Sequence, residues 1–513
     1  MPETPDKWWR NAVMYEVYVR SFADGNGDGV GDLIGLRERL PHLAALGVDA
    51  IWLTPFFRSP MVDGGYDVAD HRDVDPSFGT LADFDAMLAA AHDLGLRVII
   101  DVVPNHTSSA HPWFQQALQD VSQRPRYHFR TGGTAPNDWE SVFGGPAWTQ
   151  VEDGEWYLHL FDPAQPDLNW DNADVRLEFE SVLRFWLDRG VDGFRIDVAH
   201  GMVKAAGYPP AGVTGQIGLL GRRVLPYFDQ DGVHEIHRAW RKILDSYPGD
   251  RIAVAEAWAS TPQRLARYTA PDELHQAFNF EFLQADWADP AAVRASIDSC
   301  IHAAESVGAP TTWVLSNHDV HRHATRLGSL ARANAAALLM LALPGSAYVY
   351  QGDELGLPEV LDLPDDARQD PVWFRSGGTD PGRDGCRVPL PWAAAAPAFG
   401  FSATGAAWLP QPDWSALAAD VQAADPGSTL ELYRRALRRR RELRGPLRWN
   451  DSAPGVLDFS RGELRCVVNL APAPVPLVVE PGAEVVLASA DVSGGELPAD
   501  AAVWIFAKTA RSS

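Results

Sequence analysis

The sequence contains few cysteines, fewer basic than acidic residues and no long hydrophobic segment. Its 513 residues include three cysteines, which are too few and too scattered for a disulfide framework or a zinc cluster. Their odd number favours a reducing, cytoplasmic location. No segment reaches the roughly 18 apolar residues that a membrane-spanning helix needs. Residues 1–20 carry charges beside two tryptophans and lack an apolar core, so we expect neither a signal peptide nor a membrane anchor.

The net charge limits the classes of partner. Lys and Arg number 44 and Asp and Glu number 68, so the formal net charge is −24. Proteins that bind nucleic acid or an anionic membrane need a basic face. Hydrophobic residues make up 46% and charged residues 22%, which is typical of a folded globular protein. We therefore expect a small neutral or cationic ligand, no nucleic acid, no membrane, and a monomer or homodimer.

Eight short apolar segments alternate with helical patterns along most of the chain. Near-continuous apolar segments are typical of strands that are buried on both faces of a parallel sheet. The expected strands are 13–19, 50–53, 98–103, 193–197, 252–255, 278–282, 312–315 and 347–350. Amphipathic helical stripes lie between them, for example at 33–46, 81–91 and 175–187. The alternation predicts an α/β protein with a (β/α)8 TIM barrel.

Two regions interrupt this alternation. Residues 104–170 are rich in Gly, Pro, Trp and His, show no convincing helix and are too long for a plain loop. We expect them to form a small domain that is inserted after the third strand. Residues 364–412 form a second long excursion, which follows the eighth strand.

The pattern changes again near residue 445. The last expected helix, 430–444, carries four arginines at 438–441, which we assign to a solvated face. The segments beyond it have strand character and are bounded by turn residues. They are 455–459, 464–470, 475–479, 484–487 and 503–507. The predicted domains are thus a barrel (1–103 and 171–444), an insert (104–170) and a C-terminal β-sandwich domain (445–513).

Acidic residues stand at the C-terminal ends of three predicted strands, where a barrel of this kind carries its chemistry. They are Asp197, Glu256 and Asp319, and His106 and His318 follow strands in the same way. A single such carboxylate is as often a structural group or a helix cap. Three carboxylates and two histidines together indicate a catalytic site.

The neighbours of two carboxylates suggest different roles. Arg195 and Asp197 are two residues apart on a strand, so their side chains leave the same face. A nearby guanidinium should keep Asp197 ionised, as a nucleophile requires. Glu256 stands among apolar residues beside Trp258, where desolvation would raise its pKa, as a general acid requires. Two carboxylates with opposite pKa shifts suit glycoside hydrolysis, and Asp319 with the histidines could bind sugar hydroxyls.

The chain resembles the α-amylase superfamily, glycoside hydrolase family 13. The matching segments occur in the family's order across nearly the whole chain: 101–106 (DVVPNH), 193–197 (GFRID), 254–258 (VAEAW) and 316–319 (SNHD). The resemblance implies that Asp197 is the nucleophile, Glu256 the acid/base and Asp319 the transition-state stabiliser. It also implies that three residues line the subsite for the non-reducing glucose, namely His106, Arg195 and His318. The implied mechanism retains the anomeric configuration through a β-glucosyl-enzyme.

Within that family, three segments resemble the oligo-1,6-glucosidase and α-glucosidase subfamily: 64–68 (GGYDV), 165–169 (QPDLN) and 383–389 (RDGCRVP). By this resemblance Asp63 and Tyr66 contact the terminal glucose and Phe161 flanks the same pocket. Ordinary packing is the alternative for the two aromatic residues. An arginine of the last segment pairs with the stabilising aspartate; we assign it to Arg387, with Arg383 as the alternative. A closed pocket would admit only a chain end, which implies exo-action on short substrates.

A loop near the N-terminus has the spacing of a calcium-binding loop. Its oxygen ligands would be the side chains at positions 1, 3, 5 and 9 and a carbonyl at position 7. These residues are Asp24, Asn26, Asp28, Asp32 and, through its carbonyl, Val30. Position 12 is Gly35 rather than the Glu of an EF-hand, so a sensor role is excluded. The resembled subfamily binds structural Ca²⁺ here; Mg²⁺ and a turn that binds nothing are the alternatives.

The linkage preference depends on the residues after the nucleophile. Val198 at this position is associated with α-1,6 linkages in the resembled subfamily, but Ala199-His200 depart from its isomaltose enzymes. We therefore favour maltose-type α-1,4 substrates, with α-1,6 activity as the alternative. His200, Lys204 and residues 209–221 are candidates for shaping the site of the leaving group.

Other functions remain to be weighed against a retaining exo-α-glucosidase. A glucosyl transferase or sugar isomerase would use the same covalent intermediate. A catalytically inactive interaction subunit would carry a membrane span and altered carboxylates, whereas all three carboxylates are present here. A starch-binding module is disfavoured because the C-terminal domain is small and has one tryptophan, Trp504.

Overall fold

Eight parallel strands form a closed barrel at the centre of the structure. This computed structural model describes residues 7–507. The predicted outer domain limits, 1 and 513, and the start of the predicted N-terminal segment lie outside the described residues. The strands are β1 (Val13–Val17), β2 (Ala50–Leu53), β5 (Arg97–Val102), β9 (Gly193–Ile196), β10 (Ile252–Ala255), β11 (Gln276–Ala277), β12 (Thr312–Val314) and β13 (Ser346–Tyr350). Their order is β11-β10-β9-β5-β2-β1-β13-β12, and a parallel bridge between Phe278 and Thr312 joins the two ends. The predicted TIM barrel is confirmed.

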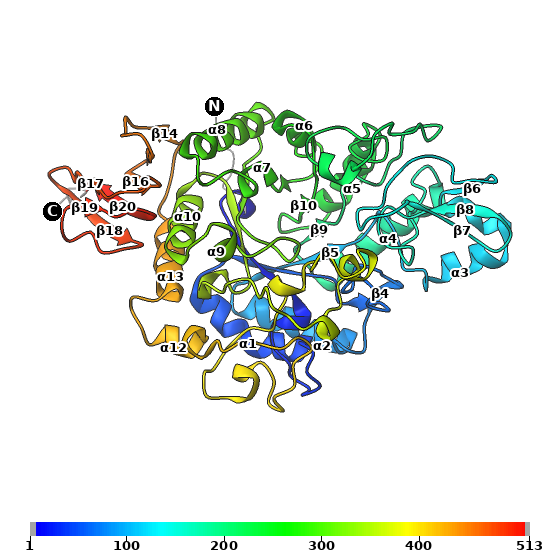
Figure 1. The fold of residues 1–513 in the computed structure, drawn as a ribbon, viewed down its shortest axis with the longest axis horizontal. Helices are drawn as coiled ribbons and strands as arrows, with labels where there is room; N and C mark the ends of the chain where they lie inside the picture. The colour runs from blue at the N-terminus through cyan, green and yellow to red at the C-terminus, as the bar shows by residue number, and fades with distance from the viewer. Residues whose placement is uncertain (1–6, 508–513) are drawn as a thin grey trace.

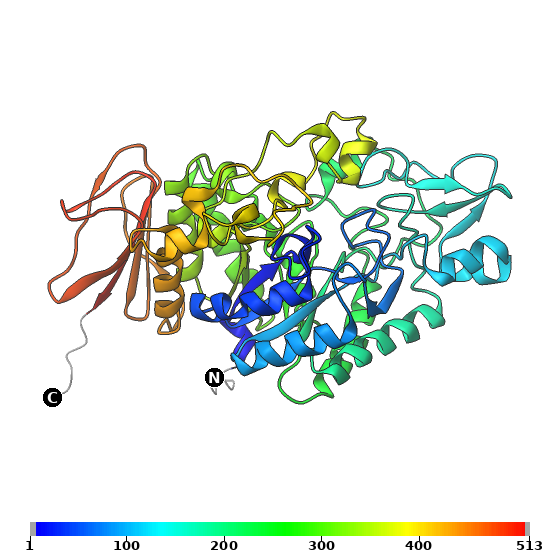
Figure 2. The same ribbon diagram turned by 90° about the horizontal axis from the view of Figure 1, so that it is seen from below.

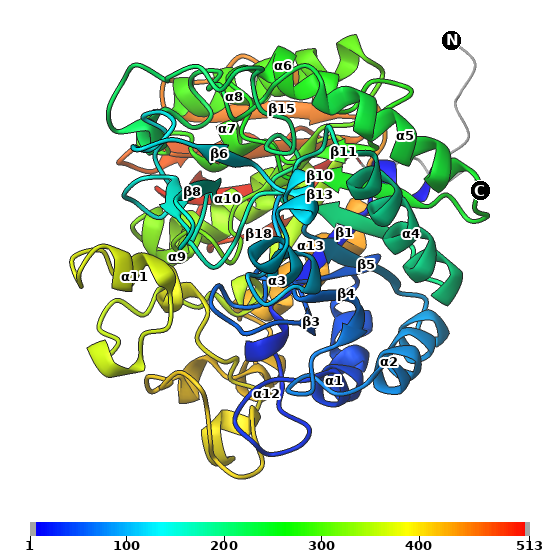
Figure 3. The ribbon, with the colours of Figure 1, turned by 90° about the vertical axis from the view of Figure 1, so that its right-hand side faces the viewer.

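Helices surround these strands, as Figure 3 shows for α1, α2, α4 and α5. The main ones are α1 (Leu33–Leu46), α2 (Leu81–Asp93), α4 (Ala173–Arg189), α5 (Val233–Asp245), α6 (Pro262–Arg267), α8 (Pro290–Ser306), α10 (Leu330–Ala342) and α13 (Thr429–Arg440). Local signals set their ends. The Asp32 side chain caps α1 by accepting from the Gly35 amide, and Gly47 ends that helix with φ = 98°, which glycine adopts without strain.

The prediction of a strand at 278–282 is wrong. The strand β11 is shorter and earlier, and helix α7 (Phe280–Leu283) occupies most of the predicted segment. Phe278, which precedes α7, and Phe280 and Phe282, which lie on it, are all buried. Phe278, Phe280 and Phe282 alternate with Asn279 and Glu281, which is the period of a strand, so the local pattern favoured a strand where the structure has a short helix.

The insert contains a small sheet. Strands β6 (Phe129–Thr131), β7 (Trp148–Gln150) and β8 (Glu155–Leu158) pair in the order β6-β8-β7. The expectation that this region has no helix is wrong, because α3 (Pro112–Gln119) lies within it. His111 caps that helix, Pro112 occupies its first turn, and Phe114 and Ala117 bury one face. Outside the insert, β3 (Phe57–Arg58) and β4 (Asp70–Val74) pair in the connection between β2 and α2.

The C-terminal region is an antiparallel β-domain, as predicted. Five strands pair in the order β14-β15-β16-β20-β18, and β17 pairs with β19. Their bounds are β14 (Arg448–Trp449), β15 (Val456–Arg461), β16 (Leu464–Asn469), β17 (Val475–Pro476), β18 (Ala483–Ala488), β19 (Glu496–Leu497) and β20 (Ala501–Ala507). Figures 1 and 2 show this domain and the β6–β8 sheet at opposite ends of the molecule, with the barrel between them.

One of the four arginines at 438–441 does not lie on a solvated face. Helix α13 ends at Arg440, and that side chain is 5% exposed whereas its neighbours are exposed. Its guanidinium donates to the carbonyls of Leu341, Leu343 and Gly345 at the end of α10. The last carbonyls of a helix have no partner within the helix, so this buried arginine satisfies them. The assignment of Arg440 to the solvated face is therefore wrong.

The excursion at 364–412 consists of loops and short helices, including α11 (Pro371–Arg375), and α12 (Ala419–Ala423) follows it. Two arginines of this excursion, Arg383 and Arg387, contact Asp319 in the loop after β12. No helix between residues 7 and 507 is both long enough and apolar enough to cross a bilayer.

Candidate active site

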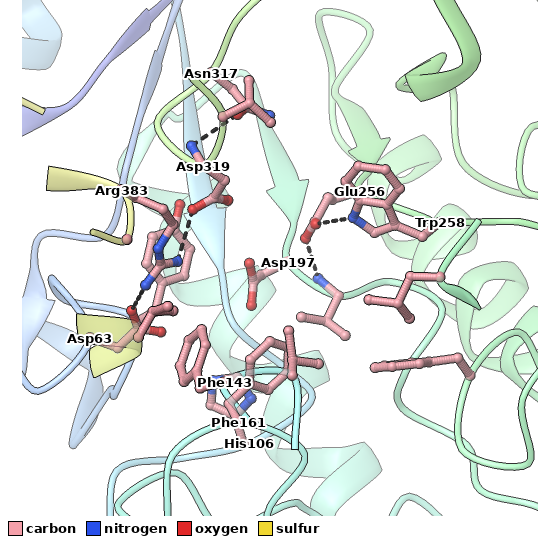
Figure 4. Close-up of a pocket in the computed structure, with 18 of the residues that line it drawn as sticks. Asp63, His106, Phe143, Phe161, Asp197, Glu256, Trp258, Asn317, Asp319 and Arg383 are labelled. Carbon is pink, nitrogen blue, oxygen red and sulfur yellow. Dashed lines mark hydrogen bonds and ion pairs between the residues drawn. The ribbon is translucent and has the colours of Figure 1, made fainter. Parts of the chain in front are cut away.

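The three predicted carboxylates share one cavity. Asp197 directly follows β9, Glu256 directly follows β10, and Asp319 lies in the loop after β12. All three line a cavity of about 400 Å³ at the C-terminal ends of the strands (Figure 4). The same cavity contacts five other predicted residues, namely Asp63, Tyr66, His106, Phe161 and Val198. The structure thus brings together residues that the chain separates by more than 250 positions.

Arg195 holds the two carboxylates beside each other. Its guanidinium is 1% exposed; Nη1 contacts Asp197, and Nη2 lies 3.1 Å from Oε2 of Glu256. Nη1 also donates to Asp101 at 2.9 Å. A planar guanidinium presents its donors in a fixed fork, so these contacts fix the relative positions of the carboxyl groups.

The environment of Asp197 differs from the prediction in one respect. The expected ion pair with Arg195 is present and acts to lower the pKa of this carboxyl. Burial acts in the opposite direction and outweighs it, and the nearby Glu256 adds to the effect, so the pKa of Asp197 is raised above its usual value. The expected ion pair is thus present, and the ionised state of Asp197 stays a prediction.

Both oxygens of Glu256 accept hydrogen bonds. The indole Nε1 of Trp258 donates to Oε1 at 3.1 Å, and the backbone amide of Val198 donates to Oε2 at 2.9 Å. The predicted neighbour Trp258 therefore orients the carboxylate as well as covering it. The ring of Trp258 is fixed in turn by stacking on Phe280, with 4.1 Å between the ring centroids.

Val198 has an unusual backbone. Its φ is 44°, in the left-handed region that β-branched residues rarely adopt. Such a conformation costs about 1–3 kcal/mol and persists where its surroundings enforce it, which is common at functional sites. Here the turn after the nucleophile directs the Val198 amide at Glu256 while its side chain lines the cavity.

Asp319 is held by two arginines rather than one. Arg383 Nη1 and Arg387 Nη2 both lie 3.0 Å from its Oδ1. Burial acts to raise the pKa of Asp319, but His318 and the guanidiniums outweigh it, so that pKa lies below its usual value. Of the two arginines, Arg383 lines the cavity, while Arg387 is 2% exposed and lies behind it. Both alternatives for the arginine thus contact the carboxylate.

The side of the cavity near Asp319 is closed by further contacts (Figure 4). Arg383 Nη2 donates to Oδ1 of Asp63 at 2.7 Å, and the Gln165 amide donates to Oδ2 of Asp63 at 3.0 Å. That amide also lies 3.2 Å from His106 Nε2. The Phe161 ring packs on His106 with 5.0 Å between centroids. These groups therefore form one connected wall, of which Gln165 is a member that the sequence did not single out.

Tyr66 and His318 form the base of this wall. Their rings stack at 5.2 Å between centroids, and the Tyr66 hydroxyl donates to Asp101 at 3.1 Å. His318 Nδ1 contacts the buried Glu16, and Nε2 lies 3.3 Å from Oδ2 of Asp319. Burial and the nearby arginines lower the pKa of His318, although Asp319 acts to raise it.

Three further residues around the site were not predicted from the sequence. Glu16 on β1 orients His318, and Asp370 holds the Arg383 guanidinium, with Oδ2 2.7 Å from Nε. Phe143 lies under the same guanidinium, 5.0 Å from its carbon, and lines the cavity. None has a local motif; Asp370 before Pro371 shows only the cap signal of α11, which its side chain does provide.

Of the residues predicted to shape the leaving-group side, some line the cavity and one does not. His200 lines the cavity and stacks on Phe228 at 4.6 Å, and Leu220 from the segment 209–221 also lines it. Lys204 does not line it. Its ammonium is buried and lies 2.7 Å from Asp167 and 2.9 Å from Oδ1 of Asn105. Lys204, which follows β9, therefore joins the loop after that strand to the insert.

The predicted metal loop follows β1, away from the cavity. Backbone amides of Asn26, Gly27 and Gly29 donate to Asp24, and those of Gly25, Asn26 and Gly35 donate to Asp32. In the described part of the chain, the carboxylates of this loop do not form a cluster within 4.8 Å of one another. The donors are all oxygens, which suits a hard cation such as Ca²⁺, and Asn26 and Val30 would have to complete the set. The calcium assignment stays a prediction.

Comparisons with known proteins agree with this geometry. The family described as "Alpha amylase, catalytic domain" matches residues 16–445, and a domain of unknown function, DUF3459, matches residues 455–504. A probable alpha-glucosidase of Rhizobium meliloti is 39% identical over 506 residues, covering 91% of this chain and 90% of its own length. An oligo-1,6-glucosidase of Parageobacillus thermoglucosidasius is 36% identical, covering 85% and 84%.

Solved structures agree over nearly the whole chain. The α-glucosyl transfer enzyme XgtA superposes with a TM-score of 0.88 at 38% identity, covering 98% of this chain and 99% of that one. The trehalulose synthase MutB of Pseudomonas mesoacidophila MX-45 gives a TM-score of 0.87 at 30% identity, covering 98% and 100%. With the matched catalytic domain and the shared cavity of three carboxylates, these findings show that the chain belongs to the α-amylase family of glycoside hydrolases.

Proposed function

We propose that the protein is a retaining, exo-acting α-glucosidase that releases glucose from the non-reducing end of short α-gluco-oligosaccharides. The observation that carries this proposal is the single cavity that Asp197, Glu256 and Asp319 line and that the Asp63–Arg383 ion pair closes on one side. Its volume of about 400 Å³ lies at the small end of ligand pockets, and a closed side supports binding of a chain end.

The first step is attack by Asp197 on the anomeric carbon. As the new carboxylate–carbon bond forms, the bond to the glycosidic oxygen breaks and Glu256 gives that oxygen a proton. Glucose is then attached to Asp197 in the β configuration. Retaining enzymes place the two carboxyl groups about 5–5.5 Å apart. The contact of one Arg195 guanidinium with both carboxylates supports such a close spacing.

The second step releases glucose. Glu256, now ionised, takes a proton from water as the water oxygen attacks the anomeric carbon, and Asp197 leaves as a carboxylate. Asp319, whose pKa lies below its usual value, remains ionised throughout and accepts hydrogen bonds from the sugar hydroxyls. Asp63 and His106 offer further polar atoms on the same wall.

For the linkage we propose α-1,4 substrates of the maltose type, with α-1,6 substrates second. Initial rates on maltose, isomaltose, sucrose, trehalose and p-nitrophenyl α-glucoside test this order. We expect the highest kcat/KM among the disaccharides on maltose, and α-glucose as the first anomer released. Faster turnover of isomaltose would reverse the linkage, and release of β-glucose would contradict retention.

A second candidate is transfer of the glucosyl group to a sugar. Leu220, Trp258 and Val320 line the cavity, and apolar walls favour a sugar ring over water as the acceptor. The resemblance to XgtA and MutB supports the same reading. Product analysis at high maltose concentration separates the two, because a hydrolase yields glucose alone while a transferase also yields trisaccharides or isomers.

We also propose structural Ca²⁺ at the loop of Asp24, Asn26, Asp28, Val30 and Asp32, with Mg²⁺ as the alternative ion. Chelation should lower the melting temperature, and added Ca²⁺ at about 100 times its Kd should restore about 2–3 kcal/mol of stability. Asp28→Asn should remove this dependence of the melting temperature on calcium. The variant should still fold, since Asp28 is exposed and caps no helix. A melting temperature that chelation leaves unchanged would contradict the proposal.

Location and assembly follow the sequence predictions. We propose a cytoplasmic enzyme, which the free, buried state of Cys300, Cys386 and Cys466 supports. We propose a monomer or homodimer that acts on a small α-gluco-oligosaccharide.

A further inference from the structure

Three ionisable side chains outside the proposed reaction meet in the core beside the barrel. His234 and His237 lie one turn apart on α5, so they project from the same face of that helix. Glu273 stands on the segment between α6 and β11. All three are buried, with exposed fractions of 3%, 0% and 3%, and none lines the substrate cavity. We call this group the His234 cluster.

The carboxylate of this cluster is fixed by arginines of α5. Arg238 Nη1 lies 3.0 Å from Glu273 Oε1, and Arg241 Nη1 donates to the Glu273 carbonyl at 2.8 Å. These contacts leave Oε2 facing the histidines. It lies 2.8 Å from His234 Nδ1 and 3.8 Å from His237 Nδ1. One atom from each side chain lies within 4.8 Å of the others, the only such group among residues 7–507.

Three imidazole nitrogens of this cluster lack a hydrogen-bond partner. They are Nε2 of His234 and both nitrogens of His237. The Ala199 carbonyl faces His237 and would favour a proton there, but it does not reach hydrogen-bond geometry. A buried polar group without a partner costs about 1–3 kcal/mol, so such groups need an explanation.

The surroundings of His237 disfavour its charged form. Burial lowers the pKa of His237 to about 3, and the nearby His234 and Arg238 add to this effect. Metal ions bind histidine as the neutral imidazole and glutamate as the carboxylate.

We propose that His234, His237 and Glu273 bind one divalent transition-metal ion, Zn²⁺, as a structural site. Two imidazole nitrogens and one carboxylate oxygen suit Zn²⁺, whereas Ca²⁺ takes six to eight oxygens. Zinc ligand bonds are about 2.0–2.2 Å, so the three atoms need only a small closing movement, and the His234–Glu273 hydrogen bond opens. A water molecule would complete a tetrahedron. The proposal rests on no part of the proposed reaction.

Such a site would join α5 to the segment that leads into β11. The Ala199 carbonyl would then accept the remaining N–H of His237, the outer contact that metal-bound histidines usually make. Ala199 is two residues from Asp197, so the metal would also support the loop that carries this carboxylate. The ion can enter beside Arg238, whose side chain is 39% exposed over Glu273.

Metal analysis of the full-length enzyme tests this proposal. The protein is stripped with chelator, dialysed against Zn²⁺ with excess Ca²⁺ present to fill any calcium site, and analysed for bound zinc. We expect one zinc per chain and a melting temperature about 2–5 °C above that of the stripped enzyme. Substitution of Zn²⁺ by Co²⁺ should give the visible absorption of a four-coordinate ion with nitrogen ligands.

Variants separate this site from chance binding at the surface. His237→Ala and Glu273→Gln should each lose the zinc, the Co²⁺ absorption and the rise in melting temperature. His302→Ala removes an exposed histidine of α8 and should retain all three. Equal zinc in all variants, or a wild-type enzyme without tightly bound zinc and without the Co²⁺ absorption, overturns the proposal. The wild-type spectrum decides the question by itself if a variant does not fold.

Discussion

Replacement of Asp197 by Ala is expected to lower kcat/KM on maltose and on p-nitrophenyl α-glucoside by at least about 10⁴-fold. The variant loses the atom that forms the covalent bond, so no change of leaving group can compensate. Because Arg195 also contacts Asp101 and Glu256, the guanidinium keeps two partners and the fold should persist. Initial rates on both substrates, with circular dichroism of the variant, measure this effect.

The matched control for this prediction is Glu281→Gln. Glu281 is an exposed carboxylate on α7 that does not line the cavity, so its loss should change kcat/KM by less than about twofold. An Asp197→Ala enzyme that keeps more than a hundredth of wild-type turnover would remove Asp197 from its proposed role.

Replacement of Glu256 by Gln should produce a loss that depends on the leaving group. General acid–base catalysis contributes about 10²–10⁴-fold, and sugar leaving groups need the proton more than p-nitrophenol does. We therefore expect kcat/KM to fall by about 10³-fold or more on maltose but much less on the aryl glucoside. Gln keeps the size of Glu256 and still accepts the Trp258 hydrogen bond through its carbonyl.

The second step of the reaction provides another test of the Glu256→Gln variant. Water attacks slowly without a general base, so glucosyl-enzyme should accumulate from the aryl glucoside and appear by mass spectrometry as an adduct on the peptide that contains Asp197. Azide needs no base and should restore turnover. Equal losses on both substrates, with no adduct and no effect of azide, would assign the acid/base role to another residue.

The ends of the barrel strands could be predicted because a strand that is buried on both faces appears in the sequence as a short apolar segment. Near-continuous apolar segments marked seven of the eight strands, and each polar residue that follows such a strand must lie at the same end of a barrel. This is why Asp197, Glu256 and Asp319 could be grouped without a structure. The prediction failed at 278–282 because its alternation of Phe with polar residues has the period of a strand, although the structure has helix α7 there.

The rest of the site could not be predicted because its contacts are not local. Glu16 and His318 are 302 residues apart and have no common spacing pattern. Asp370 and Arg383 lie in an excursion of loops and short helices, where periodicity gives little information. The pKa of Asp197 depends on burial, which the neighbouring Arg195 in the sequence does not reveal.

Val198 performs two tasks with separate atoms. Val198 lines the cavity, while its main-chain nitrogen donates to Glu256. Exchange of this side chain can therefore remodel the pocket for another sugar without breaking the hydrogen bond, since every amino acid except proline carries the same donor. In this arrangement substrate choice can diversify at a position adjoining the nucleophile while the chemistry stays intact.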